Sequence, residues 1–191
     1  MSKELNSDNV FNDIDFSDQN IKQLEFENCT FSNCNFLKSD LTNTKFVDCN
    51  FIACNLSMSK IQETAFRNVE FKECKLLGLY FENSNNFLFS ASFDSCILNS
   101  SSFYKLIMKK TKFSNCSLKE VDFSYSDLSE SIFENSDLDL AIFEKTNLNK
   151  VDFTSSFNFS IDPEKNQLKK TKFSRLNLTG LLDKYDLDIT K

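Results

Sequence analysis

The chain has 191 residues, with 22 Phe, seven Cys, two Gly and one Pro, and it contains neither His nor Trp. Without His it lacks the commonest general base and metal ligand, and two glycines are too few for a phosphate-binding loop. A formal charge of −6 argues against nonspecific attraction to nucleic acid or anionic lipid. Most enzyme classes are therefore disfavoured, and we expect a non-enzymatic protein with no cofactor, no metal and no direct nucleic-acid contact.

Membrane and export signals are not apparent in the sequence. No apolar run approaches the length of a membrane span, and residues 1–20 are acidic and polar, unlike a signal peptide. We therefore expect a cytoplasmic protein that does not bind membranes.

A large apolar residue recurs every five positions through most of the chain. The pattern runs from Phe11 to Phe81, resumes two residues late at Phe93 and continues to Phe153; with Phe173, which keeps the same spacing, 18 of the 22 Phe lie on it. The residue two positions before each of these centres is small or modest in size, and the other three are mostly polar. This period fits neither a helix nor a flat strand, and it predicts a chain that bends regularly and turns two side chains of every five inward.

A second period of twenty residues lies above the first. When the two extra residues between Phe81 and Phe93 are left out of the count, every twentieth position from Phe11 is Phe. These positions are Phe11, Phe31, Phe51, Phe71, Phe93, Phe113, Phe133, Phe153 and Phe173. If four pentapeptides form one coil, like residues stack on one face. With paired backbones about 4.8 Å apart, eight coils rise roughly 38 Å. The two periods predict an all-β solenoid with four faces.

Runs such as "CTFSN CNFLK SDLTN TKFVD CNF" and "YSDLS ESIFE NSDLD LAIFE KTNLN KVDF" resemble the pentapeptide-repeat family, whose pattern is A(D/N)LXX. The resemblance implies a right-handed quadrilateral parallel β-helix. We place it at residues 9–178, after an N-terminal tail at residues 1–8.

Two places break the repeat. Residues 83–90 hold two extra residues, which predict a bulge at one corner; a tolerated insertion explains so short a bulge better than a contact loop does. Residues 157–168 form an irregular coil, because Pro163 falls at a centre position and has no amide to donate to the ladder.

Residues 179–191 form a C-terminal module that follows a different pattern. Thr179 is expected to cap a short helix. After that helix, apolar and polar residues alternate, which predicts a short strand. One interpretation is a monomeric cap over the open end of the solenoid. However, "LTGLLDKYDLDI" resembles the module through which Qnr-like and mycobacterial fluoroquinolone-resistance proteins pair tail to tail. That resemblance implies a homodimer, with the candidate interface at Leu181, Leu182, Tyr185, Leu187 and Ile189.

The seven cysteines share one repeat position, two residues before a centre. Their spacings are multiples of five rather than those of zinc sites, and parallel side chains one coil apart do not suit disulfides. We expect them to be small buried core residues with free thiols: Cys29, Cys34, Cys49, Cys54, Cys74, Cys96 and Cys116.

Charge is the remaining indication of function. Between Lys119 and Glu144 there are eight acids and one base, and this stretch spans more than one coil, so it wraps the rod. Those acids are the candidate partner-binding acidic surface: Glu120, Asp122, Asp127, Glu130, Glu134, Asp137, Asp139 and Glu144. Carboxylates just before a centre also suit solvated bends, so a structural role is an alternative for several of them.

The resemblance to Qnr-like proteins implies a DNA mimic that binds a type II topoisomerase, DNA gyrase, and protects it from quinolones or related poisons. The alternative is a structural or adaptor solenoid that binds another protein and has no relation to topoisomerases.

Overall fold

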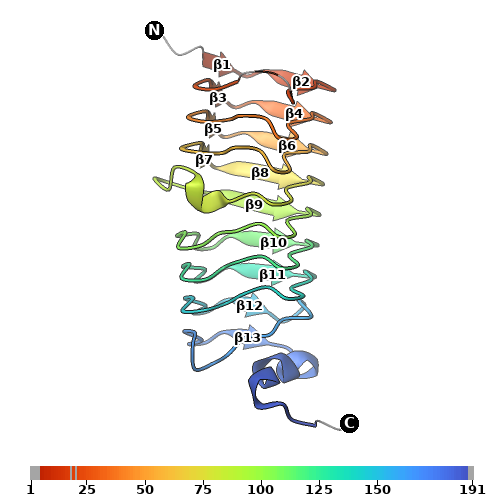
Figure 1. Cartoon of the computed structure of the whole chain (residues 1–191), viewed down its shortest axis with the longest axis vertical. Helices are drawn as coiled ribbons and strands as arrows, with labels where there is room; N and C mark the ends of the chain where they lie inside the picture. The colour runs from red at the N-terminus through yellow and green to blue at the C-terminus, as the bar shows by residue number, and fades with distance from the viewer. Residues whose placement is uncertain (1–4, 18, 20, 189–191) are drawn as a thin grey trace.

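The chain winds into a rod of stacked coils, and short helices follow the last coil at the C-terminal end (Figure 1). The computed structural model describes residues 5–17, 19 and 21–188. Within them the strands are β1 (Leu5–Ser7), β2 (Val10–Asn12), β3 (Glu25–Glu27), β4 (Thr30–Ser32), β5 (Lys45–Val47), β6 (Asn50–Ile52), β7 (Ala65–Arg67), β8 (Val69–Lys72), β9 (Ala91–Asp94), β10 (Lys112–Ser114), β11 (Ile132–Glu134), β12 (Asp152–Phe153) and β13 (Lys172–Phe173). The 3₁₀ helices are η1 (Phe81–Asn83), η2 (Arg175–Leu181) and η3 (Asp183–Tyr185).

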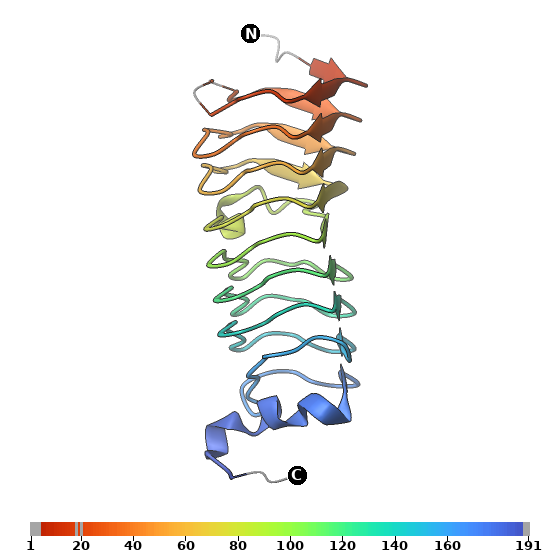
Figure 2. The ribbon, with the colours of Figure 1, turned by 90° about the vertical axis from the view of Figure 1, so that its right-hand side faces the viewer.

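The strands form two parallel sheets on adjacent sides of the rod (Figure 2). The larger sheet has nine strands in the order β13-β12-β11-β10-β9-β8-β6-β4-β2, and the smaller has the order β1-β3-β5-β7. Their register pairs residues twenty apart, as in Phe31 with Phe51 and Phe113 with Phe133. This confirms the predicted quadrilateral parallel β-helix and its twenty-residue coil.

We number the four faces by the first centre residue of each stack: face 1 begins at Phe11, face 2 at Phe16, face 3 at Ile21 and face 4 at Phe26. The chain turns at the residue two positions after most centres. There the backbone φ is positive even without glycine, for example 54° at Asn33 and 57° at Leu140. Side chains on either side of a centre face outward, so each of the four faces carries polar and charged groups along the rod.

The interior is filled by the predicted Phe ladder. Its nine rings stack one above the next, with centroids 5.0 Å apart for Phe93–Phe113 and 4.8 Å apart for Phe113–Phe133. All members from Phe31 to Phe153 are buried. Stacked rings interlock edge-on with a neighbouring stack, as Phe103 does with Phe113, so aromatic packing accounts for much of the core.

Many of the hydroxyls and thiols two residues before a centre supply a buried hydrogen bond as well as filling space. The hydroxyl of Thr64 donates to the carbonyl of Leu41 at 2.8 Å, and that of Thr146 donates to the carbonyl of Phe123 at 3.0 Å. The thiol of Cys54 makes the equivalent bond to Phe31 at 3.3 Å. Each bond joins one coil to the previous one and satisfies a buried backbone carbonyl.

The expected bulge lies on face 4, between β8 and β9. Phe71 pairs with Phe93, two residues more than the usual spacing, and η1 precedes the extra residues. Phe87 and Leu88 are exposed at its tip, and the Arg67 guanidinium lies over the Phe87 ring at 5.5 Å. The smaller sheet ends at β7, just before this insertion.

In the irregular coil at residues 157–168, hydrogen bonds of the Asn166 side chain stand in for regular backbone pairing. Near Pro163 the amide of Asn166 donates to the carbonyl of Phe143 at 2.9 Å, and its oxygen accepts from the backbone amide of Thr146 at 2.9 Å. These bonds link the coil to the one before it, so the register of twenty persists to Phe173.

The C-terminal helix begins earlier than predicted. The Ser174 hydroxyl, rather than that of Thr179, accepts the capping hydrogen bond, from Leu176 N at 3.2 Å, because the chain turns directly after β13. Residues 186–188 form no strand, and Ile189 lies outside the described residues. The module docks closely, since Ile161 N donates to the Gly180 carbonyl at 2.8 Å and a Cβ on Gly180 would overlap the Phe159 carbonyl.

Candidate functional site

The inward residues form a buried, mainly apolar core, so we look for function on the surface. All seven cysteines are buried and free. Burial raises the pKa of the Cys34 thiol and raises that of Cys49 to about 12, so these thiols are protonated and poorly nucleophilic at neutral pH. No group of three or more Cys, Asp or Glu that could hold a metal occurs among the residues that the structure describes.

The eight candidate carboxylates do not form one surface. Asp137 and Asp139 lie on face 2, Glu120 at the corner between faces 2 and 3, and Asp122 and Glu144 on face 3. The remaining three are elsewhere: Asp127 on face 4, Glu130 at the corner between faces 4 and 1, and Glu134 in β11 on face 1. The predicted acidic stretch therefore wraps the rod, and five of its eight members share two adjoining faces.

Several of these carboxylates have a structural role. Asp122, Asp127 and Asp137 each accept a hydrogen bond from the backbone amide two residues on, at 2.8, 3.0 and 3.2 Å. Asn35 and Asn147 make the same contact at bends where no charge is present. These Asp side chains thus stabilise the bend before a corner, as the alternative interpretation expected.

Lysines of neighbouring coils neutralise part of the acidic charge. Asp127 pairs with Lys109 at 3.3 Å, Glu134 with Lys112 at 3.2 Å, and Asp137 with Lys119 at 3.1 Å. Glu130 lies 2.8 Å from Lys150. Hydrogen bonds and charge from Lys150 lower the pKa of Glu130. No ion pair involves Asp122 or Glu144 within the part of the chain that the structure describes, so no lysine offsets the charge of these two.

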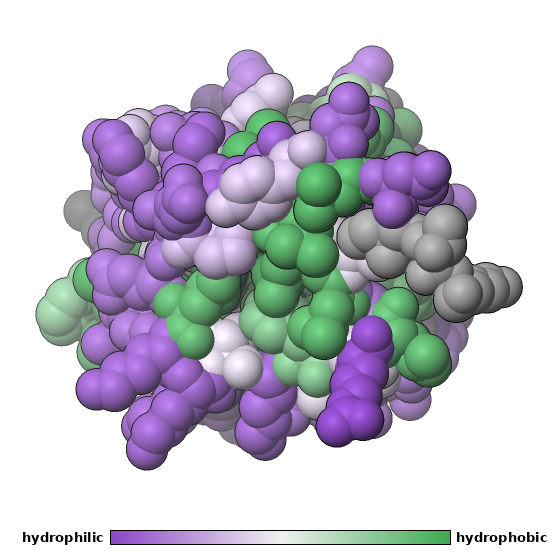
Figure 3. Space-filling view, turned by 90° about the horizontal axis from the view of Figure 1, so that it is seen from below, coloured by the Kyte–Doolittle hydropathy of each residue, from purple (hydrophilic) through white to green (hydrophobic). Residues whose placement is uncertain are grey.

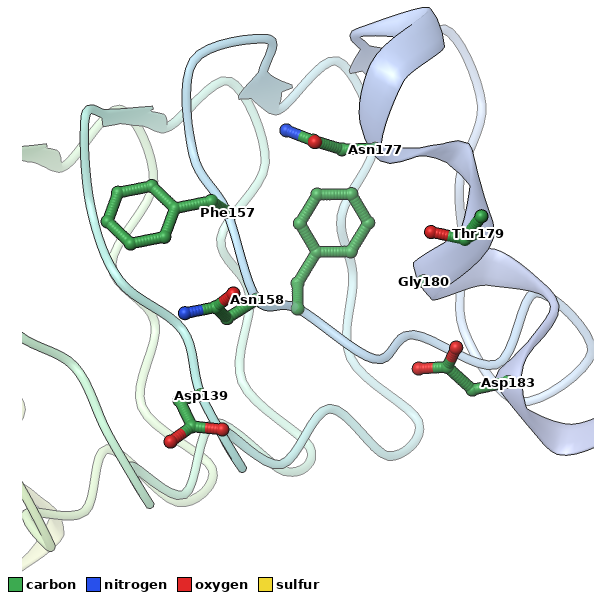
Figure 4. Close-up of a pocket in the computed structure, with 8 residues that line it drawn as sticks. Asp139, Phe157, Asn158, Asn177, Thr179, Gly180 and Asp183 are labelled. Atoms are coloured by element: carbon green, nitrogen blue, oxygen red, sulfur yellow. The ribbon is translucent and has the colours of Figure 1, made fainter. Parts of the chain in front are cut away.

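A surface pocket of about 360 Å³ lies where the last coils meet the terminal helices (Figure 4). Asp139 lines it on the coil side and Asp183 on the helix side, with Asn158 and Asn177 contributing amides. Asn177 donates to the Ser156 carbonyl at 2.8 Å, which holds η2 against the coil. Asn158 instead donates to the Asp137 carboxylate of the preceding coil at 2.8 Å.

The C-terminal end carries an exposed apolar surface. Figure 3 shows hydrophobic side chains gathered across the middle of this end and hydrophilic ones around them. Of the candidate interface residues, Leu182, Tyr185 and Leu187 are exposed, whereas Leu181 packs against the core. Leu176, which is 89% exposed, and Leu178 belong to the same module and were not among the candidates. Leu176 and Leu178 belong to this module because η2 starts at Arg175, earlier than the sequence predicts.

No helix in the described part of the chain combines the length and apolar character that crossing a membrane requires.

A model of the pentapeptide repeat region matches residues 7–81 and 106–181, leaving out the bulge. No curated protein matches the chain. Among solved structures, full-length QnrB1, described as a plasmid-mediated fluoroquinolone resistance protein, is 19% identical, with 96% of this chain and 100% of that chain covered and a TM-score of 0.47. HetL, a pentapeptide repeat protein involved in heterocyst differentiation regulation from the cyanobacterium Nostoc sp. strain PCC 7120, is 10% identical, with coverages of 87% and 86% and a TM-score of 0.40.

Such low identities and TM-scores carry no argument about function. The two matched segments, however, span most of the repeats seen in the structure. The chain belongs to the pentapeptide-repeat family.

Proposed function

We propose that this protein is a non-catalytic rod that binds a basic surface of another protein, and that its partner is a type II topoisomerase, DNA gyrase, which it protects from quinolones or related poisons. The observation that supports this proposal is the convergence of five carboxylates on faces 2 and 3 and the corner between them: Glu120, Asp122, Asp137, Asp139 and Glu144. We call these residues the acidic surface.

The acidic surface keeps a net negative charge after its ion pairs are counted. Lys119 is its one base, at 3.1 Å from Asp137 and 3.9 Å from Asp139. The other three acids have no lysine partner among the described residues, although Glu120 accepts a hydrogen bond from Ser100 at 2.9 Å. Carboxylates repeated along a stack can enter a basic channel that normally receives phosphates, and they would steer association by charge.

The test is a gyrase supercoiling assay with ciprofloxacin, with and without the protein. The variant Glu120→Gln/Asp122→Asn/Glu144→Gln removes three charges, and its Asp122→Asn change keeps a side-chain oxygen that can accept from the amide of Ser124. The control Glu27→Gln/Glu70→Gln/Glu73→Gln removes as many charges from exposed positions on faces 1 and 4 and the corner beyond face 1. Wild type and control should restore supercoiling, whereas the first variant should lose most protection.

Equal loss of protection in both variants would reduce the effect to net charge and contradict a defined acidic surface. No protection by a folded wild-type protein would overturn the gyrase proposal itself.

The second candidate is an adaptor solenoid that binds a different protein. Ion pairing favours it, because Asp127, Glu130, Glu134 and Asp137 face lysines of adjacent coils and do not present bare negative charge as a nucleic-acid backbone does. Failure of the supercoiling assay at saturating protein would leave this alternative as the better account.

A homodimer through the C-terminal end is part of the proposal. The exposed side chains of Leu176, Leu182, Tyr185 and Leu187 would be covered by the same surface of a second copy. The proposed partner also places the protein in the cytoplasm, where its seven thiols would stay reduced.

A further inference from the structure

Lysines from three of four successive coils gather on face 4 and its two corners, and the remaining coil, at residues 125–130, carries none. Ile107, Asp127, Asn147 and Gln167 pair in sequence along this face. The corner residues flanking them stack in the same register. This strip, which we call the lysine face, carries eight exposed lysines: Lys105, Lys109, Lys110, Lys145, Lys150, Lys165, Lys169 and Lys170.

The lysine face has a charge opposite to that of the whole chain. Its only acids are Asp127 and Glu130, so eight bases and two acids give a net charge of +6, against −6 for the protein. Three of its lysines, Lys165, Lys169 and Lys170, have no ion pair among the described residues.

Aromatic rings, rather than carboxylates, hold two more of the lysines. The ammonium groups of Lys105 and Lys145 lie 5.9 and 5.3 Å from the centre of the Tyr125 ring, and Lys145 donates to its hydroxyl at 3.3 Å. Lys105 also lies 4.9 Å from the Tyr104 ring. A ring face holds a cation in place without neutralising it, so both ammonium groups remain available to an anion.

Adjoining faces limit where an anionic partner can lie. On face 3 the unpaired carboxylates of Asp122 and Glu144 repel it, and on face 1 Glu134 and Asp152 pair with Lys112 and Lys172. A polyanion is therefore attracted along the rod axis, over the lysine face alone.

The charge density of the strip identifies the class of partner. Four coils at about 4.8 Å each span about 19 Å, so a net charge of +6 corresponds to one positive charge per about 3 Å. One strand of a nucleic-acid duplex carries one phosphate per about 3.4 Å of axis. An extended acidic polypeptide, which rises about 3.3 Å per residue, reaches that density only if nearly every residue is Asp or Glu. Lysines without arginine also suit phosphate contacts that do not select a base sequence.

We propose that the lysine face binds the phosphodiester backbone of nucleic acid without sequence specificity. The expectation of no nucleic-acid contact came from a net charge averaged over all four faces, whereas binding depends on the charge of one face. The proposal does not depend on the gyrase proposal, which concerns faces 2 and 3.

Fluorescence anisotropy tests the proposal, with a labelled 20-base-pair DNA duplex and a labelled 20-nucleotide single strand as probes. Dissociation constants in the micromolar range are expected at low salt, and the affinity for the duplex should fall about 10³-fold between 50 and 200 mM salt if about six phosphates are contacted. The preferred probe shows whether duplex or single-stranded backbone is recognised.

The variant Lys165→Gln/Lys169→Gln/Lys170→Gln should weaken binding at least tenfold and reduce the slope of log affinity against log salt by about 3. The control Lys38→Gln/Lys60→Gln/Lys75→Gln makes the same charge change at exposed positions on faces 2 and 3 and their corner. It should change the affinity less than threefold. Unchanged circular dichroism in both variants excludes unfolding.

Three results would overturn the proposal. One is the absence of binding to either probe at 50 mM salt. Another is an equal loss in the two variants. The third is tighter binding of polyglutamate than of both nucleic acids, which would assign the lysine face to an acidic protein.

Discussion

The rings of Phe81 and Phe103 lie parallel across the bulge, with centroids 4.5 Å apart and 6° between their planes. Before the bulge the ring stack next to the Phe ladder is on face 4, at Phe26, Phe46 and Phe66. After it, the stack is on face 3 and consists of Phe81, Phe103, Phe123 and Phe143. The bulge thus marks the place where the second aromatic stack changes face, while the first continues unbroken.

Removing one ring from the continuous ladder should be costly. Phe113 is fully buried between Phe93 and Phe133. We expect Phe113→Ala to lower the free energy of unfolding by about 3–5 kcal/mol, through lost burial and the cavity left behind, as measured by urea denaturation. Phe87→Ala, at a ring that is 67% exposed, is the control and should cost less than about 0.5 kcal/mol. A loss below about 1 kcal/mol for Phe113→Ala would contradict the stacking argument.

The buried hydroxyls two residues before a centre should contribute through hydrogen bonding. Thr64→Val keeps the shape of a buried side chain but leaves the carbonyl of Leu41 without its 2.8 Å donor. The expected loss is about 1–3 kcal/mol in the free energy of unfolding. At the exposed Thr154, where water replaces the bond to Asp152, the same substitution should change stability by less than about 0.5 kcal/mol. Equal effects at both sites would show that side-chain shape, not the hydrogen bond, matters.

The terminal helices should detach from the last coil at low pH. Lys184 lies 2.7 Å from both Asp162 and Glu164, and hydrogen bonds from Lys184 lower the pKa of each carboxyl. Desolvation opposes the charge of Lys184, but its bonds to Asp162, Glu164 and Tyr185 outweigh this and raise its pKa.

A lowered carboxyl pKa gives stability that is complete above the unfolded pKa of about 4 and is lost as the pH falls through the folded value. Thermal melts of wild type and Lys184→Met should therefore differ most above pH of about 5. The difference in melting temperature between the two proteins should vanish as the pH falls below the folded pKa values of Asp162 and Glu164. A difference that persists at low pH would mean that Lys184 acts by packing rather than by charge.

The C-terminal apolar surface should control assembly. Leu182→Asp or Leu187→Asp should convert a dimer into a monomer with unchanged circular dichroism, because a charge would be buried in the interface. Leu140→Asp is a suitable control, since Leu140 is 68% exposed at a corner of the solenoid. Light scattering measures the mass of each variant. A monomeric wild type at micromolar concentration would contradict the proposed dimer.

Sequence periodicity alone was sufficient to predict the architecture. Every fifth residue must be buried and every twentieth must stack, so Phe11 to Phe173 could be assigned to one ladder, the cysteines to the core and residues 83–90 to a bulge. These features depend on contacts that repeat along the chain, and a repeat is visible without coordinates.

The C-terminal docking and the grouping of charges were decided by tertiary structure. The start of η2 depends on Ser174 and on the close approach of Gly180 to Phe159, which are single contacts with no period. Charges are grouped by stacking, because successive pentapeptides lie on successive faces. A run such as residues 119–144 therefore visits every side of the rod. Lysines from three separate coils, by contrast, meet on one face only when the coils stack.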